Sequence, residues 1–458
     1  MVLLTNVGST SHSPLRTAFE FGEHAMNDQS SNVGSNTPSR RDFLKQSAVV
    51  AGSVAGLASS ARAFAGGSDV IRVGLIGCGG RGTGAAAQAL RADKGVQLVA
   101  MGDAFADRLS SSHSTLKAQK DLADRVQVDN DHRFVGIDAY KSVIEASDVV
   151  LLTTPPHFRP AQLKAAIEAG KHVFCEKPVA VDGPGVRSVI ETAKLAAEKN
   201  LTIVSGLCWR YHHGKRAAFE RIHGGEIGDI TSMRCSYLTG GLWTHPRQPS
   251  WSDFEFQLRN WLYYTYLSGD HITEQHIHSL DKMGWAMKDQ TPIRASGTGG
   301  RQTRLDPIYG HIYDHFAVEY EYENGVRAFS RCRQQDGCQN DVTDHIYGTK
   351  GFMDVMGHKQ YDYAGNLVWR FKGNGGNMYQ IEHDEMFAAL RAGKTINNGD
   401  YMAKSTLMAV MGRMAAYTGK TITWQQALNS KEDLTPASYD FGPMDMPKVP
   451  MPGITPFA

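Results

Sequence analysis

The sequence predicts an α/β protein in which a doubly wound parallel sheet is followed by an α+β domain with a large open, mainly antiparallel sheet. Between about residues 69 and 205, short apolar runs alternate with helical patterns, as a parallel sheet with helices on both faces requires. After Gly206 the pattern changes to longer strands joined by turn residues. The 458 residues are also enough for two domains at the usual ~100 to 200 residues each.

A glycine-rich turn directly follows the first apolar run, residues 70–76, and precedes a helical pattern at 83–92. The turn reads Gly77-Cys78-Gly79-Gly80-Arg81-Gly82. Gly77 permits the tight turn, Gly79 lets the backbone approach a pyrophosphate, and Gly82 lets the helix pack close to the strand. The helix N-terminus then receives the pyrophosphate on its free N–H groups. The turn therefore predicts a Rossmann domain whose cofactor contacts include Gly77, Gly79, Gly80, Arg81 and Gly82.

An acidic residue, Asp103, follows the second apolar run at 96–101 and lies 21 positions after Gly82. At the end of a strand it would lie beside the adenosine ribose, where a carboxylate accepts hydrogen bonds from both hydroxyls and repels a 2′-phosphate. This favours NAD over NADP as the cofactor. Arg81 and Arg108 could shield a phosphate, so NADP stays as the less favoured alternative.

The remaining elements follow in order along the chain. In the first domain, strands are expected at 149–153, 172–175 and 202–205, with helices at 160–168 and 185–199. In the second domain, strands 316–322 and 326–331 flank Asn324-Gly325, the preferred pair for a two-residue hairpin. Further strands are expected at 230–238, 293–297, 343–347 and 367–371, which makes a sheet of at least six strands. Helices near 381–391 and 401–417 precede a proline-rich arm at 443–456, expected to pack over a neighbouring surface.

The first 65 residues are predicted to be a disordered leader that carries an export signal. Ser39-Arg40-Arg41-Asp42-Phe43-Leu44-Lys45 precedes a mildly apolar stretch at 48–58 and then Ala61-Arg62-Ala63-Phe64-Ala65. This is the pattern of a twin-arginine signal with cleavage points, read by the twin-arginine (Tat) export machinery. The apolar stretch is far shorter than the ~20 residues of a membrane span, so no membrane anchor is expected. The predicted organisation is leader 1–65, Rossmann domain 66–207 and substrate and oligomerisation domain 208–458.

Export would place the mature protein in the periplasm or beyond. The twin-arginine pathway carries folded proteins, so a nucleotide would be loaded in the cytoplasm and should be held tightly rather than exchanged. With 48 basic and 47 acidic residues, nothing favours nucleic acid or a membrane surface as a partner. An exposed antiparallel sheet face would favour a homodimer or homotetramer. A Cys332–Cys338 disulfide is conceivable in an oxidising compartment.

Two motifs end neighbouring strands of the first domain: Thr153-Thr154-Pro155-Pro156-His157 and Glu176-Lys177-Pro178. The carboxyl ends of parallel strands line the ligand crevice, so both motifs should face the nicotinamide. The expected cofactor contacts are Thr154, Pro155, His157, Glu176 and Lys177. Lys177 is also the first candidate for catalysis, against the alternative of a surface lysine paired with Glu176.

In the second domain, ionisable residues are concentrated at 270–281. Glu274, His278 and Asp281 stand at i, i+4 and i+7, on one face of a helix. His278 could exchange a proton while a carboxylate fixes its tautomer. His276 and His278 could instead form a metal pair, but residues at i and i+2 do not share a helical face and no third ligand is evident, so no metal is expected.

Hydride transfer from a carbinol needs a base for the hydroxyl proton and donors for the developing oxyanion, and Lys177 with His278 supplies both. The expected substrate contacts are Arg210, Tyr211, His276 and Asp281. Aromatic residues near this region could stack on sugar rings, with core packing as the alternative for at least half of them. They are Trp209, Tyr211, Trp243, Trp251, Trp261 and Tyr263, Tyr264 and Tyr266.

Together these motifs resemble the Gfo/Idh/MocA family, the group of glucose-fructose oxidoreductase and inositol dehydrogenase. The resemblance rests on the glycine turn, the T-P turn, Glu176-Lys177-Pro178, Gly225-Glu226-Ile227-Gly228 and Glu274-x-x-x-His278-x-x-Asp281. It implies oxidation or reduction of a sugar or cyclitol hydroxyl, with Lys177, Glu274 and His278 in catalysis and substrate binding. The sequence departs from the family by having Glu274 where aspartate is usual, and Arg159 where the T-P segment often ends in histidine.

Three functions are open on these grounds. The first is an oxidoreductase acting on a sugar, glycoside or cyclitol with tightly bound NAD. The second resembles the family's NAD-dependent glycosidases, which oxidise a ring hydroxyl transiently, eliminate the aglycone and re-reduce. The third, a non-catalytic sugar-binding protein, is disfavoured because Lys177 and His278 are both intact.

Overall fold

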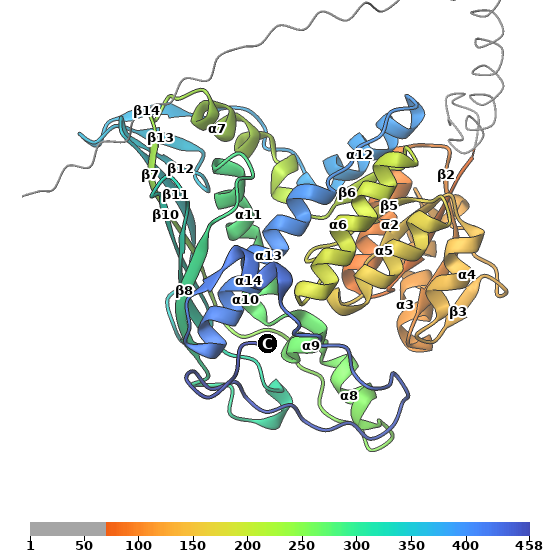
Figure 1. The fold of residues 1–458 in the computed structure, drawn as a ribbon. Coiled ribbons are helices and arrows are strands. Elements are labelled where there is room, and N and C mark those ends of the chain that lie inside the picture. The colour runs from red at the N-terminus through yellow and green to blue at the C-terminus, as the bar shows by residue number, and fades with distance from the viewer. Residues whose placement is uncertain (1–69) are drawn as a thin grey trace, which may run out of the picture. The chain divides into compact units, whose positions relative to one another are not determined.

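The computed structural model describes residues 70–458, and the predicted twin-arginine leader lies outside them. The first domain contains a six-stranded sheet with all neighbours parallel, in the order β3-β2-β1-β4-β5-β6 (Figure 1). Its strands are β1 Ile71–Ile76, β2 Val96–Asp103, β3 Arg133–Val135, β4 Val149–Leu152, β5 His172–Cys175 and β6 Ile203–Ser205. Its helices are α2 Gly80–Ala92, α3 Ala106–Lys117, α4 Ala139–Ala146, α5 Arg159–Glu168 and α6 Gly183–Glu198. The predicted parallel sheet is confirmed.

The strand order explains where a ligand can bind. The chain leaves β1 towards β2 on one side and returns to β4 on the other, so the order reverses between β1 and β4. Crossover connections diverge at such a point and leave a crevice at the carboxyl ends of the strands. The central strand β4 is buried along its whole length, as a strand covered on both faces must be.

The second domain contains a nine-stranded sheet in the order β14-β13-β12-β11-β7-β10-β9-β8-β15. The strands are β7 Ile230–Thr239, β8 Arg294–Gly300, β9 His315–Glu321, β10 Arg327–Gln334, β11 Asp341–Gly348, β12 Phe352–Asp354, β13 Lys359–Tyr361, β14 Leu367–Arg370 and β15 Ile422–Thr423. The pair β7–β10 is parallel, and the other neighbours are antiparallel, so the predicted mainly antiparallel sheet is confirmed.

Helices cover one face of this sheet, on the side of the first domain (Figure 1). The helices of this part of the chain are α7 His213–His223, α8 Asp253–Arg259, α9 Thr265–Ser268, α10 His271–Glu274, α11 Ile277–Ala286, α12 Met378–Arg391, α13 Gly399–Thr418 and α14 Trp424–Asn429. Helix α13 packs against both β8 and α6, so it is buried almost all round. It therefore joins the two domains through a shared core.

The hairpin at Asn324-Gly325 forms, but its turn is longer than the predicted two residues. The Gly325 N–H donates to the Tyr322 carbonyl, and the Tyr322 N–H donates to the Val326 carbonyl, both at 2.9 Å. Only Gly325, with φ of 82°, takes a left-handed conformation there. A two-residue type I′ turn needs positive φ at both central positions, so this is a type I turn followed by a glycine bulge.

Helix α12 returns to the first domain, although the sequence pattern placed it in the second. It packs against α2, and Met386, Phe387 and Leu390 belong to the core cluster of β1 and β2. The following segment adds to the sheet edge, where the Ile203 N–H donates to the Ile396 carbonyl at 2.8 Å. Residues 378–398 thus complete the nucleotide-binding domain.

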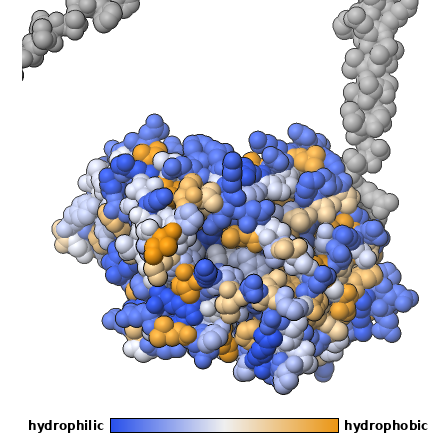
Figure 2. All heavy atoms as spheres, turned by 60° about the horizontal axis from the view of Figure 1, so that its bottom comes forward, coloured by the Kyte–Doolittle hydropathy of each residue, from blue (hydrophilic) through white to orange (hydrophobic). Residues whose placement is uncertain are grey.

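The proline-rich arm packs over its own chain, where the Tyr313 hydroxyl donates to the Pro450 carbonyl at 2.9 Å. Figure 2 shows the side on which the arm lies, with apolar residues in small separate groups among hydrophilic ones. The conceivable Cys332–Cys338 disulfide is not formed, because Cys332 is buried in the core while Cys338 is exposed. Within residues 70–458, no helix is long and apolar enough to cross a membrane.

Candidate nucleotide-binding and active site

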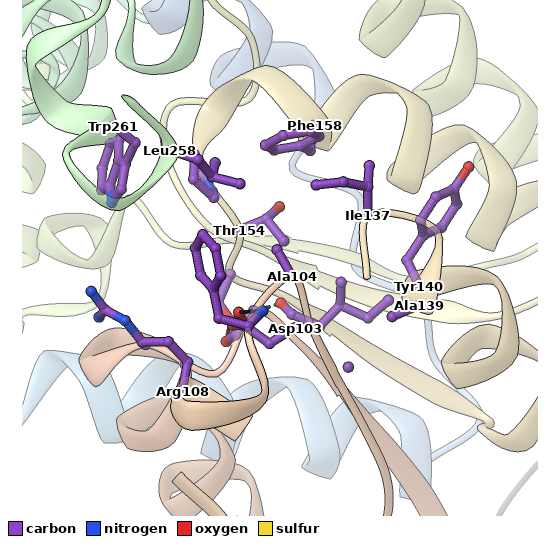
Figure 3. A pocket seen from close by; sticks show the side chains of 18 of the residues that line it. Asp103, Ala104, Arg108, Ile137, Ala139, Tyr140, Thr154, Phe158, Leu258 and Trp261 are labelled. Carbon is purple, nitrogen blue, oxygen red and sulfur yellow. Dashed lines mark hydrogen bonds between the residues drawn. The ribbon is translucent and has the colours of Figure 1, made fainter. Parts of the chain in front are cut away.

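A cavity of about 460 Å³ lies at the carboxyl ends of the parallel strands (Figure 3). Of the predicted cofactor contacts, Gly77, Gly79, Gly80, Arg81, Gly82, Asp103, Thr154 and Pro155 line it. The cavity thus runs along the glycine turn and past the end of β2, as a dinucleotide requires.

The glycine turn has the geometry that a pyrophosphate needs. Gly77 has φ of 92°, and a Cβ at Gly82 would collide with the Gly77 carbonyl oxygen. Gly79, which caps α2, faces open space, with no heavy atom within 4 Å of the position of a Cβ. The helix N-terminus is therefore accessible from the cavity, and its N–H groups can hold a pyrophosphate.

Asp103 is fixed where the ribose is expected. Its carboxylate accepts hydrogen bonds from the Cys78 N–H at 2.6 Å and the Phe105 N–H at 2.9 Å. Burial raises the pKa of this carboxyl above its ordinary value. Each oxygen has a second lone pair for a ribose hydroxyl. Together with the glycine turn, Asp103 makes the cavity fit NAD.

Lys177 and Glu274 form an ion pair between the two domains. Lys177 follows β5, and its ammonium donates to Glu274 Oε1 at 2.8 Å and to the Glu274 carbonyl at 2.6 Å. The side chains of Lys177 and Glu274 are 15% and 16% exposed, so a small ligand can reach the pair. The alternative pairing of the Lys177 ammonium with Glu176 is not found.

His278 lies at the start of α11 with a side chain nearly buried, and its Nδ1 has no hydrogen-bond partner in the structure. Its ring is edge-on to that of Trp209, with 6.4 Å between centroids. Burial and the positive charges of Lys177 and Lys282 hold the pKa of His278 well below 6.5. The imidazole is therefore neutral near pH 7 and able to accept a proton.

The prediction of one continuous helix through Glu274, His278 and Asp281 is wrong. Helix α10 ends at Glu274, and α11 begins at Ile277. The break turns Glu274 towards Lys177, whereas Asp281 lies deeper, 1% exposed. The shared face inferred from spacing does not exist.

Two of the expected substrate contacts, Arg210 and Asp281, hold each other instead. Arg210 donates from Nε and Nη2 to Asp281 at 2.9 to 3.1 Å, and from Nη2 to Asp289 at 2.6 Å. The Ser405 hydroxyl also donates to Asp281, at 2.8 Å. Both carboxylates and the guanidinium are thus satisfied within the protein, and we assign structural roles to Arg210 and Asp281.

The other two expected substrate contacts are also buried with protein partners. Tyr211 is 4% exposed, and its hydroxyl donates to Asn398 at 3.0 Å. His276 is fully buried, and its Nε2 lies 2.7 Å from the Ser330 hydroxyl. Neither side chain can reach a ligand without rearrangement, so both are corrected to structural residues.

Glu176 and Arg81 form a buried network with a residue that the sequence did not reveal. Arg81 donates to Glu176 and, at 2.8 Å, to Glu382 of α12. Burial raises the pKa of Glu382 well above its usual range, whereas the pKa of Glu176 is lowered because Arg81 and Lys177 outweigh its burial. The network fixes the start of α2 against α12. Glu382 lies 301 positions from Arg81, outside any local motif.

His157 points away from the cavity. Its Nε2 lies 2.7 Å from the Tyr439 hydroxyl, and its ring packs beside those of Phe158 and Tyr266. It therefore holds the segment before the arm rather than a cofactor. Within residues 70–458, no three side chains of the metal-binding types converge on one point.

The cavity has a second wall, formed by residues of the second domain that the sequence analysis did not place at the nucleotide site. Trp243, His245, Leu258, Arg259 and Trp261 line it, all from the segment between β7 and α9. Trp243 and Trp261 were considered as sugar-stacking residues, but the structure places them at the nucleotide cavity. The sequence shows that aromatic residues are frequent in this segment, but it does not show which surface they face.

The fold and the cavity define a two-domain dinucleotide-binding protein. The family model described as "Oxidoreductase family, NAD-binding Rossmann fold" matches residues 71–207, and that described as "GFO/IDH/MocA C-terminal domain" matches residues 216–354. The two matches together span more than half of the chain. The chain therefore belongs to the Gfo/Idh/MocA family of oxidoreductases.

The individual relatives share less than a third of their residues with this chain over the matched segments. Inositol 2-dehydrogenase 3 of Saccharopolyspora erythraea is 28% identical over 259 residues, which are 56% of this chain and 64% of that protein. A glycosyl hydrolase family 109 protein of Solibacter usitatus is 28% identical over 229 residues, 47% of this chain and 50% of that protein. The chain thus spans less than two thirds of either relative. Scyllo-inositol dehydrogenase of Lactobacillus casei, solved with NAD(H) and scyllo-inositol, shares the fold with a TM-score of 0.59 at 18% identity, covering 78% of this chain and 100% of that one.

Proposed function

We propose that the protein is an NAD-dependent oxidoreductase that transfers hydride from or to a CH–OH group of a sugar, glycoside or cyclitol. The observation that carries the proposal is the ion pair of Lys177 and Glu274 near neutral His278. None of the three lines the dinucleotide cavity, but Lys177 follows β5, the neighbour of β4, and Thr153 and Thr154 after β4 line it.

The side chains have complementary roles. Glu274 orients the Lys177 ammonium, which donates to the substrate oxygen as negative charge develops on it. His278 accepts the hydroxyl proton, because it is neutral and 9% of its surface stays exposed, although its Nδ1 is buried without a protein partner. NAD held at the glycine turn and Asp103 would supply the hydride acceptor.

A second function, redox-neutral glycoside cleavage, is favoured by the relatives named as glycosyl hydrolase family 109 proteins. The same proton-transfer groups would then act twice, once in oxidising a ring hydroxyl and once in restoring it. A nucleotide that stays bound suits this cycle, because no net oxidation occurs.

The proposal extends to the setting of the enzyme. The twin-arginine pattern at 39–65 supports export to the periplasm with NAD already bound. A homodimer or homotetramer through the open sheet is supported by Phe329 of β10, which is 47% exposed.

The test is to purify the full-length protein, release its nucleotide by denaturation, and follow the redox state of that nucleotide with free sugars, cyclitols and aryl glycosides. We expect about one NAD per chain, as tight binding implies. Accumulation of NADH with a free sugar or cyclitol supports the oxidoreductase, whereas aglycone release without NADH supports the glycosidase.

Lys177→Met is the matched variant, since it removes the ammonium but leaves the glycine turn intact. It should retain NAD and lose turnover with every substrate. If the wild-type protein neither contains nor binds NAD, or if the variant turns over at the wild-type rate, the proposed function is wrong.

A further inference from the structure

We infer that the adenosine end of the nucleotide site is completed by the second domain, so that Trp243, His245, Arg259 and Trp261 close over bound NAD and retain it. The inference rests on the proposed binding of NAD in this cavity. It makes the cofactor a long-lived part of the protein and names the residues that keep it there.

The first step of the argument is the composition of the cavity wall. Ile137, Tyr140 and Phe158 of the first domain line one part of it, and Leu258 and Trp261 of the second domain line another. In Figure 3, Trp261 lies across the cavity from Tyr140, with Asp103 and Thr154 between them. A flat heteroaromatic base gains most from burial between such apolar and aromatic walls.

The second step is how the wall is attached. Arg259, at the end of α8, donates from Nη1 and Nη2 to both carboxylate oxygens of Asp107 in α3, at 3.0 and 3.1 Å. Its guanidinium also lies 3.9 Å from the ring centroid of Phe105, which directly precedes α3. A two-pronged ion pair combined with stacking fixes orientation as well as distance. Arg259 therefore ties the second domain to the first beside Asp103.

The third step is how the rest of the wall is held. Buried Asn260 accepts from the His245 N–H at 2.8 Å and donates to the His245 carbonyl at 2.9 Å. His245 Nε2 in turn lies 3.3 Å from Arg108 Nη2 of α3, and the Trp243 and Trp261 rings are 6.2 Å apart. The loop that carries Trp243 and His245 is thus fastened both to α8 and to α3.

These contacts control release of the nucleotide rather than chemistry. Arg108 and Arg259 also bring positive charge to the site of an anionic ligand. Because the wall and the Rossmann turn come from different domains, separation of α8 from α3 would open the cavity and speed the release of NAD. This is the property that an enzyme without access to free NAD requires.

The experiment measures the dissociation rate of NADH, not turnover. Protein loaded with NADH is diluted into excess NAD, and the loss of bound-NADH fluorescence is followed with time. Trp261→Ala should release NADH roughly 10-fold faster or more, as is usual when a central aromatic contact is removed. Asp107→Asn should release it about 2- to 5-fold faster, because the partner of Arg259 is a largely exposed carboxylate.

Arg247→Ala is the matched control. Arg247 belongs to the same segment and is likewise an arginine paired with a carboxylate, Asp253, but it lies outside the cavity. It should leave the release rate unchanged. Circular dichroism and the melting temperature establish whether each variant is folded. If Trp261→Ala does not fold, Asp107→Asn still tests the inference.

The outcomes separate the two claims. If wild-type protein binds no NADH, the proposed function fails and the inference fails with it. If wild-type protein binds NADH but Trp261→Ala and Asp107→Asn release it at the wild-type rate, only the inference is overturned. Equal acceleration in Arg247→Ala would also overturn it, because the effect would then be a general loosening of the segment.

Discussion

His278 and His276 show how two histidines of one short segment differ in what they can do. His276 is fully buried against the Ser330 hydroxyl, whereas His278 keeps 9% of its surface exposed; Nδ1 of both rings is buried without a hydrogen-bond partner. Both pKa values are lowered, chiefly by burial, that of His276 to about 3. Only His278 therefore combines the neutral form with access to a ligand.

At the residue scale, we expect His278→Ala to lower kcat by about 10²- to 10⁴-fold, the usual contribution of a proton-transfer group. His276→Ala should change kcat by less than about 10-fold and lower the melting temperature instead, because it leaves a cavity and an unpaired hydroxyl. Steady-state rates and thermal melts of both variants distinguish the two roles. A larger kcat loss for His276→Ala would reverse the assignment.

At the scale of the element, the strand–turn–helix unit of β1 and α2 depends on two glycines for different reasons. Gly82 is needed because α2 packs against the Gly77 carbonyl and Thr153. Gly79 is needed only if something occupies the open space in front of it. Gly82 is therefore required by the packing of the fold, whereas Gly79 is required by ligand binding.

We therefore expect Gly82→Ala to lower both stability and NAD affinity, with a cost of about 1 to 3 kcal/mol from forced repacking. Gly79→Ala should leave the melting temperature of the NAD-free protein unchanged while it weakens NAD binding. Calorimetric titration and thermal melts of the stripped proteins test this pair. An unchanged NAD affinity in Gly79→Ala would place the pyrophosphate elsewhere.

Other elements show where local patterns fail. The spacing of Glu274, His278 and Asp281 predicted one helical face, but α10 ends at Glu274 and α11 begins at Ile277. Glu274 is held by Lys177 while Asp281 is held by Arg210. The Asn324-Gly325 hairpin was predicted correctly except for its turn length. Strand β3, only three residues long, carries too little pattern to be recognised.

At the scale of the whole molecule, several histidines are buried in the neutral form. Burial lowers the pKa of His172 and His311 to about 4 and that of His276 to about 3. In the unfolded chain each would have its ordinary value of 6.5. The unfolded state therefore binds more protons than the native state between about pH 6.5 and 4.

We expect the free energy of unfolding to fall as the pH falls through this window, by up to about 1.4 kcal/mol per pH unit for each such histidine. Glu382 and Asp103 act in the opposite direction, because their raised pKa values favour the native state in acid, but they are two groups against several. Urea unfolding between pH 7 and 4.5 measures the slope, and His311→Gln should reduce it. A flat profile would contradict the burial of neutral imidazoles.

Features that depend on neighbouring residues could be predicted from the sequence. The glycine turn, Asp103, the alternation of strands and helices, and the position of Lys177 after a strand all follow from local sterics and periodicity. These suffice to predict the two sheets and the location of the nucleotide site, because backbone conformation and burial pattern are set within a few residues.

Which distant residues meet depends on how the two domains pack. Lys177 pairs with Glu274, 97 positions away, and Arg81 with Glu382, 301 positions away. Trp243 and Trp261 line the cavity at the glycine turn, and Arg210 is paired with Asp281. No local pattern encodes such partners, since charge and aromatic surface are satisfied by whatever the packing of the two domains brings within reach.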